Sequence, residues 1–209
     1  MKKRWLAIAL ASTTLAGCAT DPSGSLPPLT LASHVDLPRF MGDWYVIANI
    51  PTFLEKGAHN AKDHYDLDAD GTIATTFSFN ADAPDGPLKH YKSRGFVLDP
   101  ASNAVWGQQY IWPIKADYRI SYVSDDYRLT VITREKRDYV WIMARTPTIS
   151  EADFNRMVAF VGSQGYDPAK LERVPRAHAR QAPAAQPHQL VDGDRKRPDP
   201  LAHGVVDGA

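Results

Sequence analysis

Short runs of aromatic and β-branched residues, each bounded by turn-forming residues, recur between residues 42 and 145. Alternating apolar and polar positions in runs of this length are typical of strands in an all-β barrel or sandwich. The connections are short, as in Asp68-Ala-Asp-Gly71, so we expect antiparallel hairpins. The pattern predicts eight strands, at residues 44–50, 61–67, 72–80, 90–98, 104–110, 118–123, 127–133 and 139–145.

After residue 145 the apolar positions recur at helical rather than strand spacing. Ser150 is followed by two acidic residues in the next turn, which is the arrangement of a helix N-cap. The sequence therefore predicts an amphipathic helix over residues 150–163, followed by a short last strand at residues 171–174. Its apolar face would be formed by Phe154, Met157, Val158 and Val161.

The N-terminal segment has the features of an export signal. Three basic residues precede an apolar stretch that is too short to span a bilayer, and Leu15-Ala-Gly-Cys18 follows. This tetrapeptide resembles the bacterial lipoprotein box, in which the Cys18 thiol would accept a diacylglycerol; an ordinary signal peptide that contains a cysteine is the alternative. We expect a signal at residues 1–17 and a lipidated tether at 18–34. In such lipoproteins Ala19 after the cysteine implies the outer membrane of a Gram-negative bacterium.

The C-terminal segment, residues 175–209, contains no aromatic residue and is rich in Ala, Pro, Gln and His. Such a segment buries too little apolar surface to offset the entropy of ordering, so we expect a disordered tail. Its basic Arg195-Lys-Arg197 could contact anionic lipid headgroups. The interspersed acidic residues favour a solvated tail instead.

Charge and cysteine content exclude several classes of function. Lys plus Arg and Asp plus Glu both number 24, so the chain lacks the basic field that nucleic-acid binding requires. Cys18 is the single cysteine, which excludes a disulfide within the chain and a metal site built on cysteines. His64 and His90 lack the paired spacing of zinc ligands. We therefore expect neither a metal nor another cofactor.

Three short motifs, in this order, resemble the signatures of the lipocalin family. They are Gly42-Asp-Trp44 after a predicted helical turn, Asp125-Asp-Tyr-Arg128 at a turn between strands, and Arg145 at the end of the last long strand. Arg145-Thr-Pro-Thr-Ile-Ser150 and Phe53-Leu-Glu-Lys-Gly57 resemble the bacterial and apolipoprotein-D-like branch. The resemblance covers residues 35–174 and implies an eight-stranded up-and-down antiparallel barrel with one helix packed outside. Its structural motif positions would be Gly42, Trp44, Asp126, Tyr127 and Arg145.

The resemblance also implies a contact between the first motif and the third. In lipocalins the residues equivalent to Trp44 and Arg145 lie together at the closed end of the barrel, with the guanidinium over the indole. Such a contact contributes roughly 0.5 to 2 kcal/mol. These residues would build the floor of the barrel and would not select a ligand.

Aromatic residues on the middle strands are the candidates for a ligand pocket. Alternation places Phe77 with Phe79, and Tyr118 with Ile120 and Tyr122, on common faces. The sequence leaves open which face lines the lumen and which packs under the helix. Lys115 and Arg119, with Lys56, are candidate cations for an anionic headgroup, on charge and loop position. The candidate pocket residues are Phe77, Phe79, Tyr110, Trp112, Tyr118, Tyr122 and Trp141.

Aromatic walls with few fixed charges suit an acyl chain. The sequence therefore predicts a non-catalytic protein that carries or stores a fatty acid or lysophospholipid, held at the outer membrane through lipidated Cys18. An enzyme acting on a lipophile in the barrel, through His64 or His90, is one alternative. An envelope interaction protein that uses its loops and tail is another. Both a monomer and a dimer are compatible with the sequence.

Overall fold

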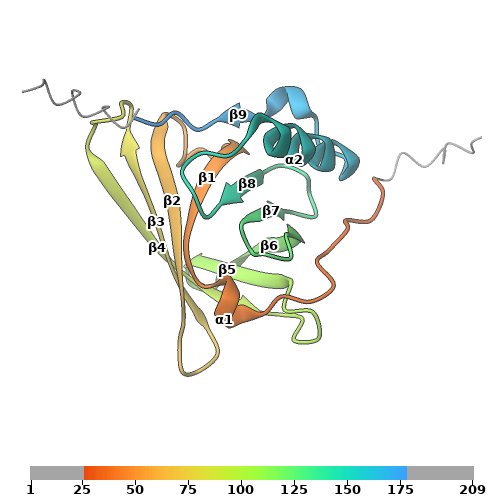
Figure 1. Ribbon diagram of the computed structural model, residues 1–209. Helices are drawn as coiled ribbons and strands as arrows, with labels where there is room; N and C mark the ends of the chain where they lie inside the picture. The colour runs from red at the N-terminus through yellow and green to blue at the C-terminus, as the bar shows by residue number, and fades with distance from the viewer. Residues whose placement is uncertain (1–25, 178–209) are drawn as a thin grey trace, which may run out of the picture. The chain divides into compact units, whose positions relative to one another are not determined.

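The computed structural model describes residues 26–177; the predicted signal with Cys18 and the chain from residue 178 lie outside them. The long strands surround a common interior (Figure 1). The lipocalin-type barrel predicted from the sequence is confirmed, and most strand ends fall within three residues of the prediction. The strands are β1 Gly42–Ile50, β2 Ala58–Leu67, β3 Ile73–Ala81, β4 Leu88–Val97, β5 Val105–Ile111, β6 Ile114–Val123, β7 Leu129–Thr133 and β8 Val140–Ala144.

The barrel closes through its first strand. Each strand from β2 to β7 pairs antiparallel with the strand that follows it, β8 pairs with β1, and β1 also pairs with β2. Closure of this kind leaves no long sheet edge exposed. The short β9, Glu172–Arg173, adds to β1 beside this ring, where the sequence predicted a last strand.

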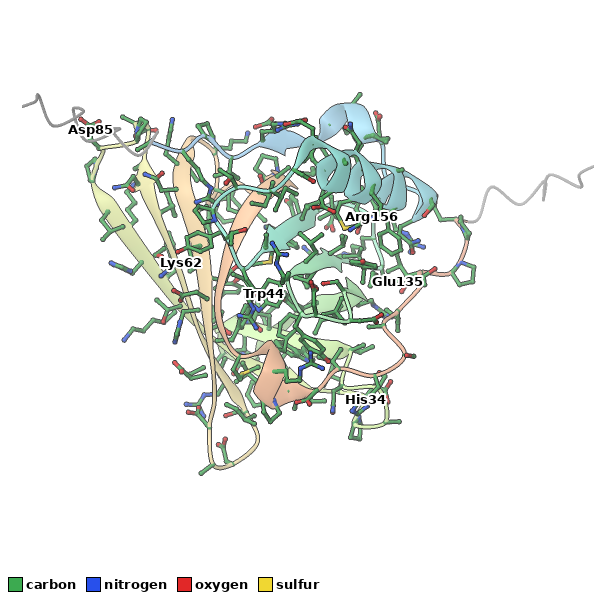
Figure 2. The ribbon with its side chains drawn as sticks, in the orientation of Figure 1. His34, Trp44, Lys62, Asp85, Glu135 and Arg156 are labelled. Carbon is green, nitrogen blue, oxygen red and sulfur yellow. The ribbon has the colours of Figure 1, made fainter. Side chains whose placement is uncertain are left out.

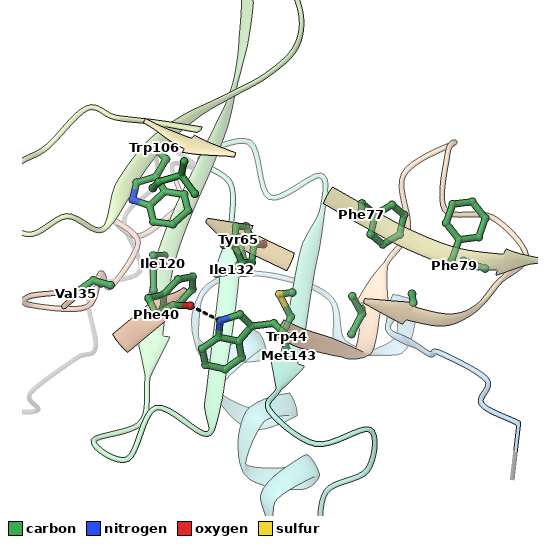
Figure 3. Close-up of a cluster of buried hydrophobic side chains, with 14 of the residues drawn as sticks. Val35, Phe40, Trp44, Tyr65, Phe77, Phe79, Trp106, Ile120, Ile132 and Met143 are labelled. Carbon is green, nitrogen blue, oxygen red and sulfur yellow. Dashed lines mark hydrogen bonds between the residues drawn. The ribbon is translucent and has the colours of Figure 1, made fainter. Parts of the chain in front are cut away.

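One end of the barrel is closed by α1, Leu37–Phe40, and by aromatic rings beneath it. Asp36 caps α1, because its carboxylate accepts a hydrogen bond from the Arg39 backbone N–H at 3.2 Å. Trp44 is fully buried, and its Nε1 donates to the Phe40 carbonyl oxygen at 2.7 Å (Figure 3). The Phe40 ring lies 5.0 Å from the Trp44 ring and 5.6 Å from the Trp106 ring, centroid to centroid. These contacts form the floor of the barrel.

The opposite end of the barrel carries the loops after β1, β3, β5 and β7. In Figure 2, Asp85 on the β3–β4 loop and His34 before α1 lie at opposite ends of the barrel. At the end that carries Asp85, the β5–β6 hairpin exposes Ile111, Trp112 and Ile114. Because α1 closes the other end, a ligand would have to enter the interior from this end.

Helix α2, Glu151–Ser163, packs on the outside of the barrel, as the sequence predicted. Its N-cap is Ser150, whose hydroxyl oxygen accepts a hydrogen bond from the Asp153 backbone N–H at 3.0 Å. Met157 and Val161 are buried in a second apolar cluster, formed with the outward-facing residues of β1, β7 and β8. A short 3-10 helix, Pro168–Lys170, then leads to β9. Within residues 26–177 no helix combines the length and the apolar content that crossing a bilayer would need.

Candidate ligand-binding cavity

The barrel encloses a cavity of about 210 Å³. Its outer part is lined by the β1–β2 loop, including Phe53 and Glu55, and its inner part reaches Tyr65 and Met143. Phe53 is 78% exposed, so the cavity reaches the surface at the end opposite α1. Much of the lining is aromatic, which is typical of sites that hold apolar ligands.

Four of the seven aromatic residues expected in the pocket line this cavity: Phe77, Tyr110, Tyr118 and Trp141. Phe79 is buried beside them, with its ring 5.2 Å from that of Phe77. Trp112 is 83% exposed at the tip of the β5–β6 hairpin. The structure therefore brings most of the predicted pocket residues together around the cavity, whereas Trp112 lies outside it.

Tyr122 lies on the other side of the barrel wall. Its ring packs against Phe160 of α2, with the centroids 5.5 Å apart, while Tyr118 lines the cavity and Ile120 belongs to the interior cluster. The expectation that the three residues share one face is wrong for Tyr122. The pairing of β6 with β7 shifts register between Ile120 and Tyr122, and a bulge of this kind reverses the alternation of side chains beyond it.

The basic residues expected at the mouth lie elsewhere. The Lys115 ammonium sits 3.7 Å from the centre of the Phe96 ring, and Lys56 is exposed. Arg119 is paired with Asp117, with Nε 2.9 Å from Oδ1, and with Glu135 at 3.2 Å. None of the three basic residues lines the cavity.

Arg134 has the only basic side chain among the described residues that line the cavity. It follows β7 directly, and the loop after β7 lies at the mouth. Its guanidinium lies 3.4 Å from the Asp138 carboxylate and 5.3 Å from the centre of the Tyr139 ring. No sequence pattern marks Arg134 for this role, because the chain has 24 basic residues and many fall in loops.

Three carboxyl groups line the cavity, those of Glu55, Asp63 and Asp117, and the sequence pattern marked none of them as internal. Glu55 is held by two donors: its carboxylate accepts hydrogen bonds from Trp141 Nε1 at 2.7 Å and from the Thr52 backbone N–H at 2.7 Å. Burial, and secondly the nearby charge of Glu55, raise the pKa of Asp63 to about 8, although a hydrogen bond with Tyr65 acts in the opposite direction. Asp63 is therefore mostly protonated at neutral pH.

Further polar groups gather at the inner end of the cavity. The hydroxyl oxygens of Tyr65 and Tyr118 are hydrogen-bonded at 2.8 Å, and burial raises the pKa of both phenols well above the ordinary value. Gln108 Nε2 donates to Ser93 Oγ at 2.7 Å. Thr75 is also buried in this part of the wall. The cavity is thus aromatic along its sides and polar where it meets the floor.

The two histidines considered for catalysis lie away from the cavity. His64 Nδ1 lies 2.6 Å from Asp43 Oδ1, and this hydrogen bond raises the pKa of the imidazole. His90 is exposed on β4, and neither residue lines the cavity. Between residues 26 and 177 there is also no cluster of three or more His, Cys, Asp or Glu side chains that could hold a metal ion.

The family-motif residues meet at the closed end. The Arg145 guanidinium lies 3.9 Å from the centre of the Trp44 ring, and it donates to the backbone oxygens of Asp43 at 2.8 Å and Arg39 at 2.7 Å. Gly42 has a φ of +89°, which favours glycine where the chain turns into β1. The other two motif positions belong to the β6–β7 turn: the Asp126 carboxylate accepts from the Arg128 backbone N–H at 3.1 Å, and the Tyr127 hydroxyl oxygen accepts from the Asp36 N–H at 2.8 Å.

A family described as "Lipocalin-like domain" matches residues 35–176. The chain belongs to the lipocalin family. Members of this family bind small hydrophobic ligands. The matched residues contain the whole barrel, α2 and β9, so the cavity lies entirely within the lipocalin domain.

Named relatives place the chain more closely. The outer membrane lipoprotein Blc of Citrobacter freundii is 30% identical over 165 residues, which are 78% of this chain and 92% of that protein. Temperature-induced lipocalin-1 of Arabidopsis thaliana is 28% identical over 158 residues, 71% of this chain and 83% of the relative. Apolipoprotein D of Mus musculus is 24% identical over 180 residues, with coverages of 79% and 93%. The predicted membership in the bacterial and apolipoprotein-D-like branch is confirmed.

Solved structures show the same fold. Insecticyanin from the tobacco hornworm Manduca sexta superposes with a TM-score of 0.59 at 13% identity, over 75% of this chain and 88% of that one. At this identity the likeness concerns the barrel alone.

Proposed function

We propose that this lipocalin holds a fatty acid or lysophospholipid in its barrel cavity and carries or stores it without chemical change. The observation that carries the proposal is a cavity with aromatic sides that reaches the surface at one end only. Burying about ten methylene groups there would contribute roughly 8 kcal/mol before the costs of association. That is enough for micromolar binding or tighter.

The place of action in this proposal is the outer membrane. Cys18 would carry the lipid anchor, and residues 18–34 would connect it to the barrel. The Leu15-Ala-Gly-Cys18 sequence and the relatives named as outer membrane lipoproteins support this location. Two or more acyl chains on one residue anchor a protein stably.

Arg134 is the cation that we propose for an anionic headgroup at the mouth, in place of Lys115 and Arg119. It lines the cavity, whereas the other two do not: Lys115 lies over the Phe96 ring and Arg119 is paired with Asp117. Its Nε is buried and has no hydrogen-bond partner within the described residues. A carboxylate or phosphate oxygen of the ligand would supply one.

The mature chain, residues 18–209 with Cys18→Ser to prevent acylation, is suited to a direct test. Lipid that copurifies would be extracted with organic solvent and identified by mass spectrometry. Added dodecanoate or lysophospholipid is expected to change tryptophan fluorescence with micromolar affinity. No copurified lipid and no fluorescence change with either ligand would contradict the proposal.

A pair of tryptophan substitutions locates the binding site. Trp141 lines the cavity, whereas Trp112 is exposed at the hairpin tip. We expect Trp141→Phe to remove most of the ligand-induced fluorescence change and Trp112→Phe to retain it. The reverse result would place the ligand on the hairpin surface rather than in the barrel. Titration calorimetry on both variants separates a lost signal from lost binding.

A further inference from the structure

The described residues contain three buried side-chain polar atoms without a hydrogen-bond partner, and all three belong to residues that line the cavity. They are Thr75 Oγ1, Gln108 Oε1 and Arg134 Nε. Thr75 and Gln108 are 4% and 3% exposed. A buried polar group without a partner costs about 1 to 3 kcal/mol. Such groups gathered around one cavity indicate that something polar belongs there.

The three atoms lie at two levels of the barrel. Thr75 is paired with Tyr65 on one side and Ser93 on the other, and Tyr65 packs on the floor ring of Trp106 with centroids 6.0 Å apart. Gln108 comes two residues after Trp106 on β5. Thr75 and Gln108 therefore belong to the inner end, and Arg134 belongs to the loop at the mouth. We call Asp63, Tyr65, Thr75, Gln108 and Tyr118 the inner polar layer.

This layer is a poor partner for the methyl end of a plain acyl chain. A hydrocarbon end would displace water from these groups and replace none of its hydrogen bonds. A hydroxyl group could both donate to Gln108 Oε1 and accept from the Thr75 hydroxyl. An ionised headgroup does not fit there, because the inner polar layer contains no basic side chain to pair with a buried negative charge.

Building on the proposed lipid binding, we infer that the preferred ligand is polar at both ends: an acyl chain with an anionic group at Arg134 and a neutral hydroxyl in the inner polar layer. The ligand class is thus an ω-hydroxylated lipophile rather than a fatty acid without the terminal hydroxyl. The aromatic sides between the two levels contact the methylene groups.

Matched ligands test this directly on the mature chain, residues 18–209 with Cys18→Ser. Dodecanoate and ω-hydroxydodecanoate differ only in the terminal hydroxyl, and titration calorimetry gives both affinities. We expect the hydroxylated ligand to bind about tenfold more tightly, the effect of one net hydrogen bond. Homologous pairs with shorter and longer chains should show the preference only where the hydroxyl reaches the layer.

Substitutions assign the preference to the layer. The double variant Thr75→Val with Gln108→Met keeps side-chain volume nearly constant and removes both unpaired oxygens. In this variant the two ligands are expected to bind within twofold of each other. Thr76→Val is the matched control, because the same change falls on the opposite face of β3. The control should keep the full preference.

The outcomes separate the inference from the proposed function. If neither ligand of any pair binds, the proposed lipid binding itself fails. If plain fatty acids bind as tightly as their hydroxylated partners at every chain length, lipid binding stands and the inference is overturned. A preference that survives in the folded double variant, checked by circular dichroism, also overturns the assignment to this layer. The comparison of the two ligands on the wild-type protein does not depend on whether any variant folds.

Discussion

Trp44→Ala is expected to lower the free energy of unfolding by about 4 kcal/mol, because it empties the floor of the barrel. The indole is fully buried, donates a hydrogen bond to the Phe40 carbonyl oxygen, and lies under the Arg145 guanidinium. Alanine leaves a cavity between these groups and removes the partner of the guanidinium face. Urea unfolding of the variant and the wild type measures the difference.

Trp112→Ala is the control for this prediction. Trp112 is 83% exposed, so its loss is expected to change stability by less than about 0.5 kcal/mol. A decrease below about 1 kcal/mol for Trp44→Ala would contradict the structural role of the floor. Ligand affinity should change little in the folded variant, since Trp44 does not line the cavity.

The barrel itself could be predicted because its signals are local. Each strand carries its own alternation, each hairpin its own turn residues, and Ser150 with the acidic residues after it marks the start of α2. The meeting of Trp44 and Arg145 was implied by the family motifs, and the structure contains that contact. None of these features depends on which face of a strand is turned inward.

The cavity lining could be predicted only in part, because it depends on register. One bulge in β6 turns Tyr122 to α2 while Tyr118 stays inside. In β2, Lys62 and His64 lie on one face, and Asp63 lies on the other between the buried Ala61 and Tyr65. The acidic side chain interrupts the apolar positions of that face, so the pattern alone does not mark Asp63 as internal. Pairing with neighbouring strands decides the matter, and the sequence does not display it.

Asp63→Asn is expected to stabilise the protein, and more strongly as the pH rises. The folded-state pKa of Asp63 is raised to about 8, whereas the ordinary value of an aspartate in the unfolded chain is near 3.8. Between these values the unfolded chain has released the proton and the folded chain has kept it. The stability of the wild type therefore falls as pH rises through this window, by at most about 1.4 kcal/mol per pH unit from this residue.

The asparagine side chain does not titrate, so the variant escapes this loss. We expect the two proteins to differ little in unfolding free energy at pH 4 and by roughly 3 kcal/mol or more at pH 8. Urea unfolding at a series of pH values gives the difference at each pH, which cancels the groups common to both proteins. The titratable groups that interact with the Asp63 carboxyl are Glu55, Tyr65, Tyr110 and Tyr118. Both proteins contain all four, so their contributions cancel.

Asp66→Asn provides the control, because Asp66 is exposed on the same strand. Its effect should stay within about 0.5 kcal/mol at both pH values. If the difference in unfolding free energy between Asp63→Asn and the wild type does not change with pH, the prediction is wrong. The Asp63 carboxyl would then be hydrated in the folded protein and would ionise at its ordinary pKa. The expected result would instead show that the fold keeps an acid in its interior at a cost in stability. Proteins tend to retain destabilising residues of this kind at functional sites, where the contribution to ligand binding outweighs the lost stability.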